Sequence, residues 1–375
     1  MRQEADALFA RQKKKFSIIC ANQFLYTKKN VTTLKKKYYI IAAVLLLGVA
    51  AAGFAYCIYS QISTPLLKES TTQYLFVDDD DTADSVEAKL SAVSSEQGMK
   101  GFRRLASHYD YAERVRTGRY AINPGEKTLD VFRKLRNGQQ QPVMLTIPEV
   151  RTMDKMASRL AQKLMLDSAT IAEALSSQQY CQQLGYDTAT IACLFVPNTY
   201  EVYWNVSLDA LMQRMQREHD SYWNDERRTK AQAQGLTPNE VVTLASIIDE
   251  ETANNAEKPM IAGMYLNRLK RGMLLQADPT VKYALGDFTL RRILNRHLEV
   301  ESPYNTYKYA GLMPGPIRVP SIQAIEAVLN PAQHDYLYMC AKEDFSGTHN
   351  FARTLAEHNQ NARRYQQALN RMGVR

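Results

Sequence analysis

The chain has 375 residues and a formal net charge of +8, a balance often met in proteins that bind nucleic acid. The charge is local, because residues 1–37 hold ten Lys and Arg against Glu4 and Asp6. Removing these from the totals of 47 basic and 39 acidic residues leaves 37 of each, which excludes a basic groove for nucleic acid.

The residues after this basic tail predict a membrane helix. Residues 38–59 carry no charge, and 22 residues at about 1.5 Å each span about 33 Å, enough for a bilayer core. Lys35–Lys37 precede the helix directly, so the positive-inside rule keeps residues 1–37 in the cytoplasm and exports the chain after Ser60. A cleaved signal peptide or a lipoprotein are the alternatives. The apolar run is longer than a typical signal sequence, and Tyr56 is too bulky to precede a lipidated cysteine.

The first exported part, residues 60–145, predicts a small α/β module. Gln61–Thr71 is expected to be a linker, and residues 73–77 a short strand. Helical character follows over residues 85–105. Residues 116–143 then predict a strand, a turn at Asn-Pro-Gly, a helix that Gly138 ends, and a second strand. A module of this kind binds a ligand or acts as a spacer, and its residues do not suggest a catalytic role.

No metal site is expected. Asp78–Asp81 lack the alternating ligands and glycine of a calcium loop, which favours a solvated turn. No Cys/His spacing is typical of a metal site. Cys181 and Cys193 either form a disulfide in an oxidising compartment or remain buried free thiols.

A strongly helical region begins after Pro148. Apolar periodicity predicts helices over residues 152–166, 168–176 and 208–234. Between the last two, residues 193–204 form an aromatic-rich segment. Its rings either stack on sugar faces in a cleft or belong to the core.

The next helix has an unusually complete start signal. Thr237 is an N-cap, Pro238 takes the first helical position, and Glu240 closes a capping box. The fixed register places Val241 and Ile248 on one apolar stripe.

Three acids end this helix. Glu251 falls at the border of the buried face, where partial loss of water raises the pKa of a carboxyl, as a general acid requires. Glu250 falls on the far side, so its substitution is expected to be nearly silent. Asp249 flanks the opposite border and is expected to raise the pKa of Glu251 by like-charge repulsion. The alternative is that all three acids form a solvated helix end.

Residues 260–271 predict one more helix, and irregular segments are expected at 274–280, 301–317 and 347–359. These segments are rich in Asn, Gln, Tyr, Gly and Pro. Amides and phenols pair with hydroxyls without a countercharge, so the segments suit a neutral carbohydrate polymer. Alternatively, they are ordinary connections.

The motifs SIIDEET, NRL, LQADPT, SPYNTY, GLMPGPI and HNF occur in that order over residues 246–351. This ordered set resembles the endolytic murein transglycosylase (YceG-like) family, whose members are membrane-bound lytic transglycosylases of bacterial cell walls. RTGRYAINPG and LFVPNTYEVYW resemble the family less sharply. Asp249 stands where a glutamate is common, and Val150 stands where the family motif has glycine.

The resemblance implies an α+β fold in three parts: a single N-terminal membrane helix at 38–59, a LysM-like module within 60–145, and a mainly helical α+β catalytic domain at 146–375. Glu251 is the implied catalytic residue, and no cofactor is required. It would protonate the glycosidic oxygen between N-acetylmuramic acid and N-acetylglucosamine. It would then accept the proton of the 6-hydroxyl, which leaves a 1,6-anhydro end. Candidates for substrate positioning are Asn267, Gln276, Asp278, Tyr304, Asn305, Tyr307 and His349.

The resemblance also implies a location and partners. The protein would be a single-pass protein of the bacterial cytoplasmic (inner) membrane, with a cytoplasmic N-terminus and an extracytoplasmic catalytic domain. Its partners would be peptidoglycan glycan strands, nascent near the membrane, and peptidoglycan synthases. Two other functions stay open: a two-carboxylate hydrolase that uses Glu251 with Asp249 or Asp278, and a non-enzymatic scaffold that binds the wall.

Overall fold

The computed structural model describes residues 2–290 and 292–372, without the side chains of residues 2–6 and 24–35. Met1, the first residue of the predicted cytoplasmic tail, lies outside this description. The described chain is a helix-rich α+β protein with two compact units. The first comprises Met1–Leu75, Asp80–Arg116 and Tyr120–Gln139, and the second Phe76–Asp79, Thr117–Arg119 and Gln140–Arg375.

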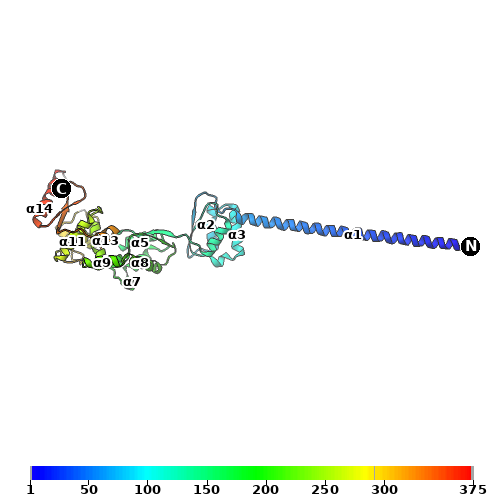
Figure 1. Cartoon of the computed structure of the whole chain (residues 1–375), viewed down its shortest axis with the longest axis horizontal. Helices are drawn as coiled ribbons and strands as arrows, with labels where there is room; N and C mark the ends of the chain where they lie inside the picture. The colour runs from blue at the N-terminus through cyan, green and yellow to red at the C-terminus, as the bar shows by residue number, and fades with distance from the viewer. Residues whose placement is uncertain (1, 291, 373–375) are drawn as a thin grey trace. The chain divides into compact units, whose positions relative to one another are not determined.

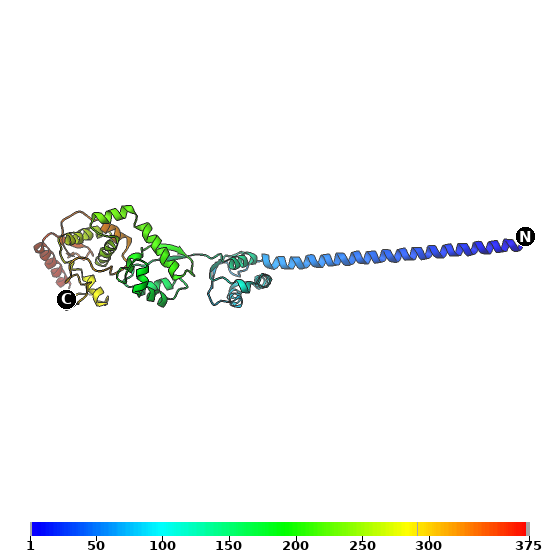
Figure 2. The same cartoon turned by 90° about the horizontal axis from the view of Figure 1, so that it is seen from below.

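One helix, α1 (Arg2–Ser63), forms the start of the first unit and is unbroken in Figures 1 and 2. Its stretch Lys36–Ser63 has a mean hydropathy of 2.4 in its most apolar part and is long enough to cross a membrane. The tail before this stretch shows no apolar periodicity that would predict a helix. In the structure the tail continues the same helix.

Residues 61–71 differ from the expected linker, because their first half packs into the first unit. Leu66 is fully buried, and its N–H donates to the carbonyl of Glu126 at 3.0 Å. A Cβ atom added at Gly101 would meet the carbonyl oxygen of Gln61 at 2.6 Å. The end of α1 therefore lies so close to the helix containing Gly101 that glycine is required there.

The rest of the region before residue 139 follows the prediction in most respects. The predicted strand is present, and two strands form a small sheet. The single helix expected at 85–105 is two helices, because Ser95 caps a new one by accepting from the N–H of Gly98. The elements are β1 (Gln73–Val77), α2 (Ala83–Val93), α3 (Glu96–His108), η1 (Tyr111–Arg114), β2 (Gly118–Ile122) and α4 (Thr128–Asn137).

The second unit begins with a hydrophobic cluster built by β3, β4 and the helices around them. The two strands are antiparallel, with Val143 opposite Val202. Phe195 and Tyr200 from the aromatic-rich segment are buried in this cluster, so these rings are core. Cys181 and Cys193 are buried free thiols. The elements are β3 (Val143–Thr146), α5 (Met153–Ala161), α6 (Ser168–Ser176), α7 (Gln178–Gln183), η2 (Ile191–Leu194), β4 (Thr199–Val202) and α8 (Leu208–Tyr222).

A second hydrophobic cluster surrounds the central helix. The long helix predicted over 208–234 is broken before Asn224, which caps the next helix by accepting from the N–H of Arg227. Residues 347–359, expected to be irregular, contain a strand and the start of a helix. The elements are α9 (Asp225–Ala233), α10 (Pro238–Glu251), α11 (Lys258–Lys270), α12 (Asp278–Leu285), η3 (Asn295–His297), α13 (Ile322–Leu329), β5 (Tyr338–Ala341), β6 (His349–Ala352) and α14 (Leu355–Arg371).

Helix α10 starts as predicted, with Thr237 and Glu240 forming a capping box. More of its surface is buried than the apolar stripe predicted, because every residue from Val241 to Ile248 is buried. The polar members are satisfied: the Ser246 hydroxyl donates to the carbonyl of Thr243 at 2.7 Å and accepts from the N–H of Ile317 at 3.0 Å. The last turn of the helix, which ends at Glu251, thus directly follows a segment that is buried in the core.

We expect Thr237→Ala to destabilise the second unit by about 1 kcal/mol, because the first turn of α10 loses its side-chain acceptor. In a unit of this size that corresponds to a melting temperature lower by about 2–4 °C. Tryptophan fluorescence follows this unit selectively, since Trp204 and Trp223 are the only two tryptophans in the sequence. Thr237→Ser, which keeps the hydroxyl, is the control. Equal melting temperatures for the Ala and Ser variants would contradict the assigned role of the cap.

Candidate active site

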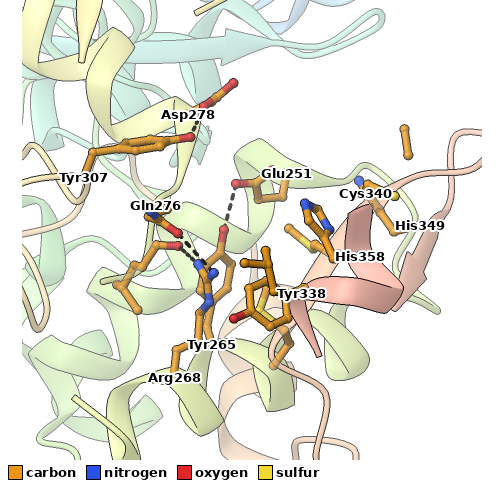
Figure 3. A pocket seen from close by; sticks show the side chains of 15 residues that line it. Glu251, Tyr265, Arg268, Gln276, Asp278, Tyr307, Tyr338, Cys340, His349 and His358 are labelled. Atoms are coloured by element: carbon orange, nitrogen blue, oxygen red, sulfur yellow. Dashed lines mark hydrogen bonds between the residues drawn. The ribbon is translucent and has the colours of Figure 1, made fainter. Parts of the chain in front are cut away.

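A cavity of about 420 Å³ opens beside the C-terminal end of α10. Figure 3 shows the Glu251 carboxyl reaching into it, with side chains from α11, β5, β6 and the loop before α12 around it. The lining residues that carry polar groups are Glu251, Tyr265, Arg268, Gln276, Asp278, Tyr307, Tyr338, Cys340, His349 and His358.

Burial dominates the chemistry of Glu251. It raises the pKa of this carboxyl to about 7, because the charged form loses its hydration. Three influences oppose the rise, led by a hydrogen bond from the Tyr265 hydroxyl at 2.8 Å and followed by the nearby charges of His349 and Lys282. The negative charge of Asp278 adds to the rise. Near neutral pH the carboxyl is therefore able both to hold and to release a proton.

Tyr265 is a fixed donor to this carboxyl. Its side chain is buried on α11, and burial, with Glu251 next to it, raises its pKa well above the ordinary value. The phenol therefore stays protonated while Glu251 titrates. It holds the carboxyl in one orientation.

Arg268, one turn after Tyr265 on α11, shapes the floor of the cavity. Its guanidinium is buried and donates to the carbonyls of Leu275 and Leu337 and, at 3.2 Å, to the side chain of Gln276. Gln276 has a φ of 52°, in the left-handed region that is uncommon for residues other than glycine. Strain of this kind is concentrated at functional sites.

Two further side chains that line the cavity, Tyr307 and His349, are each held in place by a carboxylate. The Tyr307 hydroxyl donates to Asp278, which fixes both at the rim (Figure 3). His349, the first residue of β6, places Nδ1 2.9 Å from the buried carboxylate of Glu257. The same carboxylate accepts the backbone N–H of His349 at 2.6 Å. The orientation of this imidazole is therefore determined by Glu257.

Asp249 does not act on Glu251 as expected. Its side chain is only 4% exposed, and its Oδ1 lies 2.6 Å from Nζ of Lys258. It also accepts the hydroxyl of Ser321 at 2.8 Å and the backbone N–H of that residue. The like charge that raises the pKa of Glu251 is Asp278, so the prediction for Asp249 was wrong. The helical geometry could not show that a lysine from another helix neutralises it.

Glu250 lies on the far side of the helix, as predicted, but it is not a solvated residue. Its side chain is 12% exposed and accepts two hydrogen bonds at 2.8 Å from Arg151 and one at 3.1 Å from Arg318. Its substitution is therefore not expected to be silent, because it would leave Arg151 without this carboxylate and Arg318 with Glu149 alone. Asp249 and Glu250 together hold the last turn of α10 from two sides.

The structure brings four of the seven proposed positioning residues to the cavity: Gln276, Asp278, Tyr307 and His349. The other three have structural contacts instead. The Asn267 amide donates to the carbonyls of His334 and Tyr336. The fully buried Asn305 donates to those of Leu298 and Val300. The Tyr304 ring packs on Tyr283 with centroids 4.7 Å apart.

Sequence reasoning missed Tyr265, Arg268, Tyr338 and His358. A signal existed for the first two. They are three residues apart on a predicted helix and thus on one face, whereas Asn267, which was chosen, lies on another. No local pattern points to Tyr338 and His358, because tertiary folding brings β5 and α14 to the cavity.

The sequence of this chain matches the model of a known family. A family model described as "YceG-like family" matches residues 75–364, most of the chain. The chain belongs to the YceG-like family.

Relatives of this YceG-like chain carry functional names. It is 29% identical over 330 residues to an endolytic murein transglycosylase from Bacillus subtilis (strain 168), covering 84% of this chain and 90% of the relative. It is also 29% identical over 271 residues to an endolytic murein transglycosylase from Streptococcus pneumoniae serotype 2. There the match covers 64% of this chain and 49% of the relative, so this chain spans about half the relative's length.

A solved structure is similar as well. The crystal structure of a yceG-like protein from Listeria monocytogenes superposes with a TM-score of 0.51 and 27% sequence identity. The superposition covers 78% of this chain and 99% of the other. The fold described above is thus shared with an experimental structure of the same family.

We expect the two neighbours of Glu251 to move its pKa in opposite directions. Tyr265→Phe removes the hydrogen bond that favours the charged form, so the pKa should rise above about 7. Asp278→Asn removes a repelling charge, so the pKa should fall below that value. A carbon-13 NMR titration of glutamate-labelled protein, with Glu251→Gln to identify the signal, measures both. Shifts of the same sign in the two variants would show that the assignment of causes is wrong.

Proposed function

We propose that this YceG-like protein is an endolytic lytic transglycosylase. It cleaves the β-1,4 bond between N-acetylmuramic acid and N-acetylglucosamine in peptidoglycan. The observation that carries the proposal is the Glu251 carboxyl, which has a pKa of about 7, lines an open cavity and accepts a hydrogen bond from a buried phenol. The names of the bacillar and streptococcal relatives support the same activity.

The reaction needs one group that first gives and then takes a proton. Protonated Glu251 donates its proton to the glycosidic oxygen while the bond from that oxygen to C1 of muramic acid breaks. The resulting carboxylate accepts the proton of the 6-hydroxyl on the same sugar as its oxygen bonds to C1. The products are a 4-hydroxyl on N-acetylglucosamine and a 1,6-anhydro muramic acid end. No water is consumed, and Glu251 returns to its protonated form.

The other residues of the cavity suit a neutral sugar. Gln276, Tyr307 and His349 present amide, phenol and imidazole groups held by internal partners. Pre-oriented donors and acceptors of this kind lower the entropy lost on binding a flexible chain. We assign them to substrate positioning, together with Asp278. Asn267, Tyr304 and Asn305 are assigned to the support of the surrounding loops.

A two-carboxylate hydrolase is the alternative that one observation favours. Asp278 lines the cavity with Glu251 and is exposed at its rim, where it could activate water. Asp249 does not fit this role, because its carboxylate is engaged by Lys258 and Ser321. The products separate the two mechanisms, since a hydrolase leaves reducing muramic acid ends.

We further propose that the enzyme works at the outer face of the bacterial cytoplasmic membrane. The apolar stretch Lys36–Ser63 would be the anchor, and the basic residues before it favour a cytoplasmic N-terminus. An anchored enzyme meets glycan strands close to the bilayer, where nascent strands and their synthases are found. The order β1, α2, α3, β2 in residues 60–145 supports the LysM-like assignment of that region.

Glu251→Gln is expected to abolish release of glycan fragments from purified peptidoglycan, because glutamine has the same shape but cannot deliver a proton. Mass spectrometry of material released by the unsubstituted full chain should find 1,6-anhydromuramic acid ends. Glu201→Gln, an exposed residue on β4, is the matched control and should retain full activity. Reducing ends as the sole primary product would replace the transglycosylase by the hydrolase. Release by Glu251→Gln would remove Glu251 from the mechanism.

The membrane orientation predicts the behaviour of a reporter. An enzyme that is active only outside the cytoplasm should be active when fused after the last residue of the chain. The same fusion with Lys36 and Lys37 changed to Glu should lose part of this activity, because the charge bias that orients the helix is weakened. Activity of a cytoplasm-specific reporter alone would contradict the proposed location.

A further inference from the structure

A second cavity, of about 530 Å³, lies in the second unit apart from the one that holds Glu251. Its lining is rich in cations and includes one aromatic ring. The residues are Glu149, Val150, Arg151, Thr152, Lys155, Arg159, Phe288 and Arg318. The mechanism proposed above uses none of them.

The charges of this cavity do not balance. Arg151 and Arg318 bind Glu250, and Arg318 also contacts Glu149, so these four groups neutralise one another. Lys155 and Arg159 are one turn apart on α5 and both line the cavity. Neither has a carboxylate partner among the residues that the structure describes. Two positive charges are therefore available for an anion from outside.

The second cavity is close to the first, because both border the same elements. Its arginines Arg151 and Arg318 hold Glu250, the neighbour of Glu251 on the last turn of α10. At the start of α12 Asp278 lines the first cavity, whereas Phe288, just past the end of that helix, lines the second. Helix α12 has eight residues and is therefore about 12 Å long, so the Asp278 and Phe288 borders of the two cavities are separated by roughly that distance.

We propose that this second cavity binds the carboxylates of peptide stems on the glycan strand, an inference that rests on the proposed function. Each muramic acid of peptidoglycan carries a short peptide stem with free carboxylates. A stem of about four residues at ~3.5 Å per residue reaches roughly 14 Å, which is of the same order as the distance between the Asp278 and Phe288 borders of the two cavities. Phe288 and the aliphatic parts of Val150 and Lys155 provide apolar contact for the stem itself.

The site thereby determines which strands are held most tightly. Strands with intact stems bind through both cavities, whereas strands stripped of their stems bind through the first cavity alone. The enzyme should prefer strands that still carry peptides.

The test measures the Kd of fluorescent glycan strands for the full chain in detergent, with Glu251→Gln throughout so that no strand is cut. Uncross-linked strands are used with their stems, or after an amidase has removed the stems. With stems present, Lys155→Gln together with Arg159→Gln should weaken binding roughly tenfold, as expected for the loss of two ion pairs formed by exposed side chains. Binding of stripped strands should not change.

The matched control is Lys270→Gln together with Arg363→Gln, which removes the same two residue types from exposed positions outside the cavity. This pair should leave both Kd values unchanged. Three results would overturn the proposal. The control pair could lose as much affinity as the cavity pair, or the chain with an unsubstituted cavity could bind stripped and intact strands equally well. The cavity substitutions could also weaken the binding of both kinds of strand by the same factor.

A third substrate, a strand that still carries a lipid diphosphate at one end, tests whether the cavity binds this diphosphate and not the stem carboxylates. If the Lys155 and Arg159 substitutions weaken only strands that still carry a lipid diphosphate at one end, the ligand is the diphosphate and the assignment to stems is wrong. Failure of the proposed function itself is read separately. It would appear as no cleavage of any strand by the chain with Glu251 intact, whatever the binding measurements give.

Discussion

The site depends on how far the Glu251 carboxyl is removed from water. A pKa near 7 results from burial, which raises it, and from the Tyr265 hydrogen bond, which lowers it. Without the hydrogen bond the group would hold its proton too strongly to return as a base. In open solvent it would be ionised and unable to act as an acid. The proposed mechanism, in which one carboxyl first gives and then takes a proton, therefore needs both burial and a donor, which the positions of Glu251 on α10 and Tyr265 on α11 supply.

Three adjacent acids show how environment assigns roles to the same chemical group. Asp249 is neutralised by a buried lysine and Glu250 by two arginines, whereas no cation among the residues that the structure describes forms an ion pair with Glu251. The two paired acids bind residues from other parts of the second unit, which fixes the rotation and position of the last turn of α10. The Asp249–Lys258 pair is buried, and a buried pair contributes little net stability but is costly to break singly. The effect of the two paired acids is positional, because a small rotation of that turn would remove Glu251 from Tyr265.

The sequence predicted correctly those features of the fold that depend on interactions between neighbouring residues. The Thr237 capping box, the Gly138 stop and the strand at residues 73–77 are each determined by a few neighbouring residues, and each was found where expected. The break at Asn224 was missed, because apolar periodicity continues on both sides of it. In the site, Glu251 followed from helical phase. Asn267 and Asn305 were misassigned, because amide content does not reveal whether a side chain binds a ligand or a distant carbonyl. Lys258 and Arg318, which engage the neighbouring acids, come from segments whose proximity only the folded chain establishes.

The packing at the end of α1 determines how the proposed membrane tether would act. A free segment at residues 61–71 would have allowed the first unit to move away from the bilayer by its own extended length. Leu66 is instead buried in that unit, and Gly101 lets the carbonyl of Gln61 approach the backbone of α3. Lengthening this segment would therefore disrupt a packed contact before it extended a tether. If α1 spans the membrane as proposed, the height of the first unit above it would be determined by a helix end and a glycine, and would thus be a property of the fold.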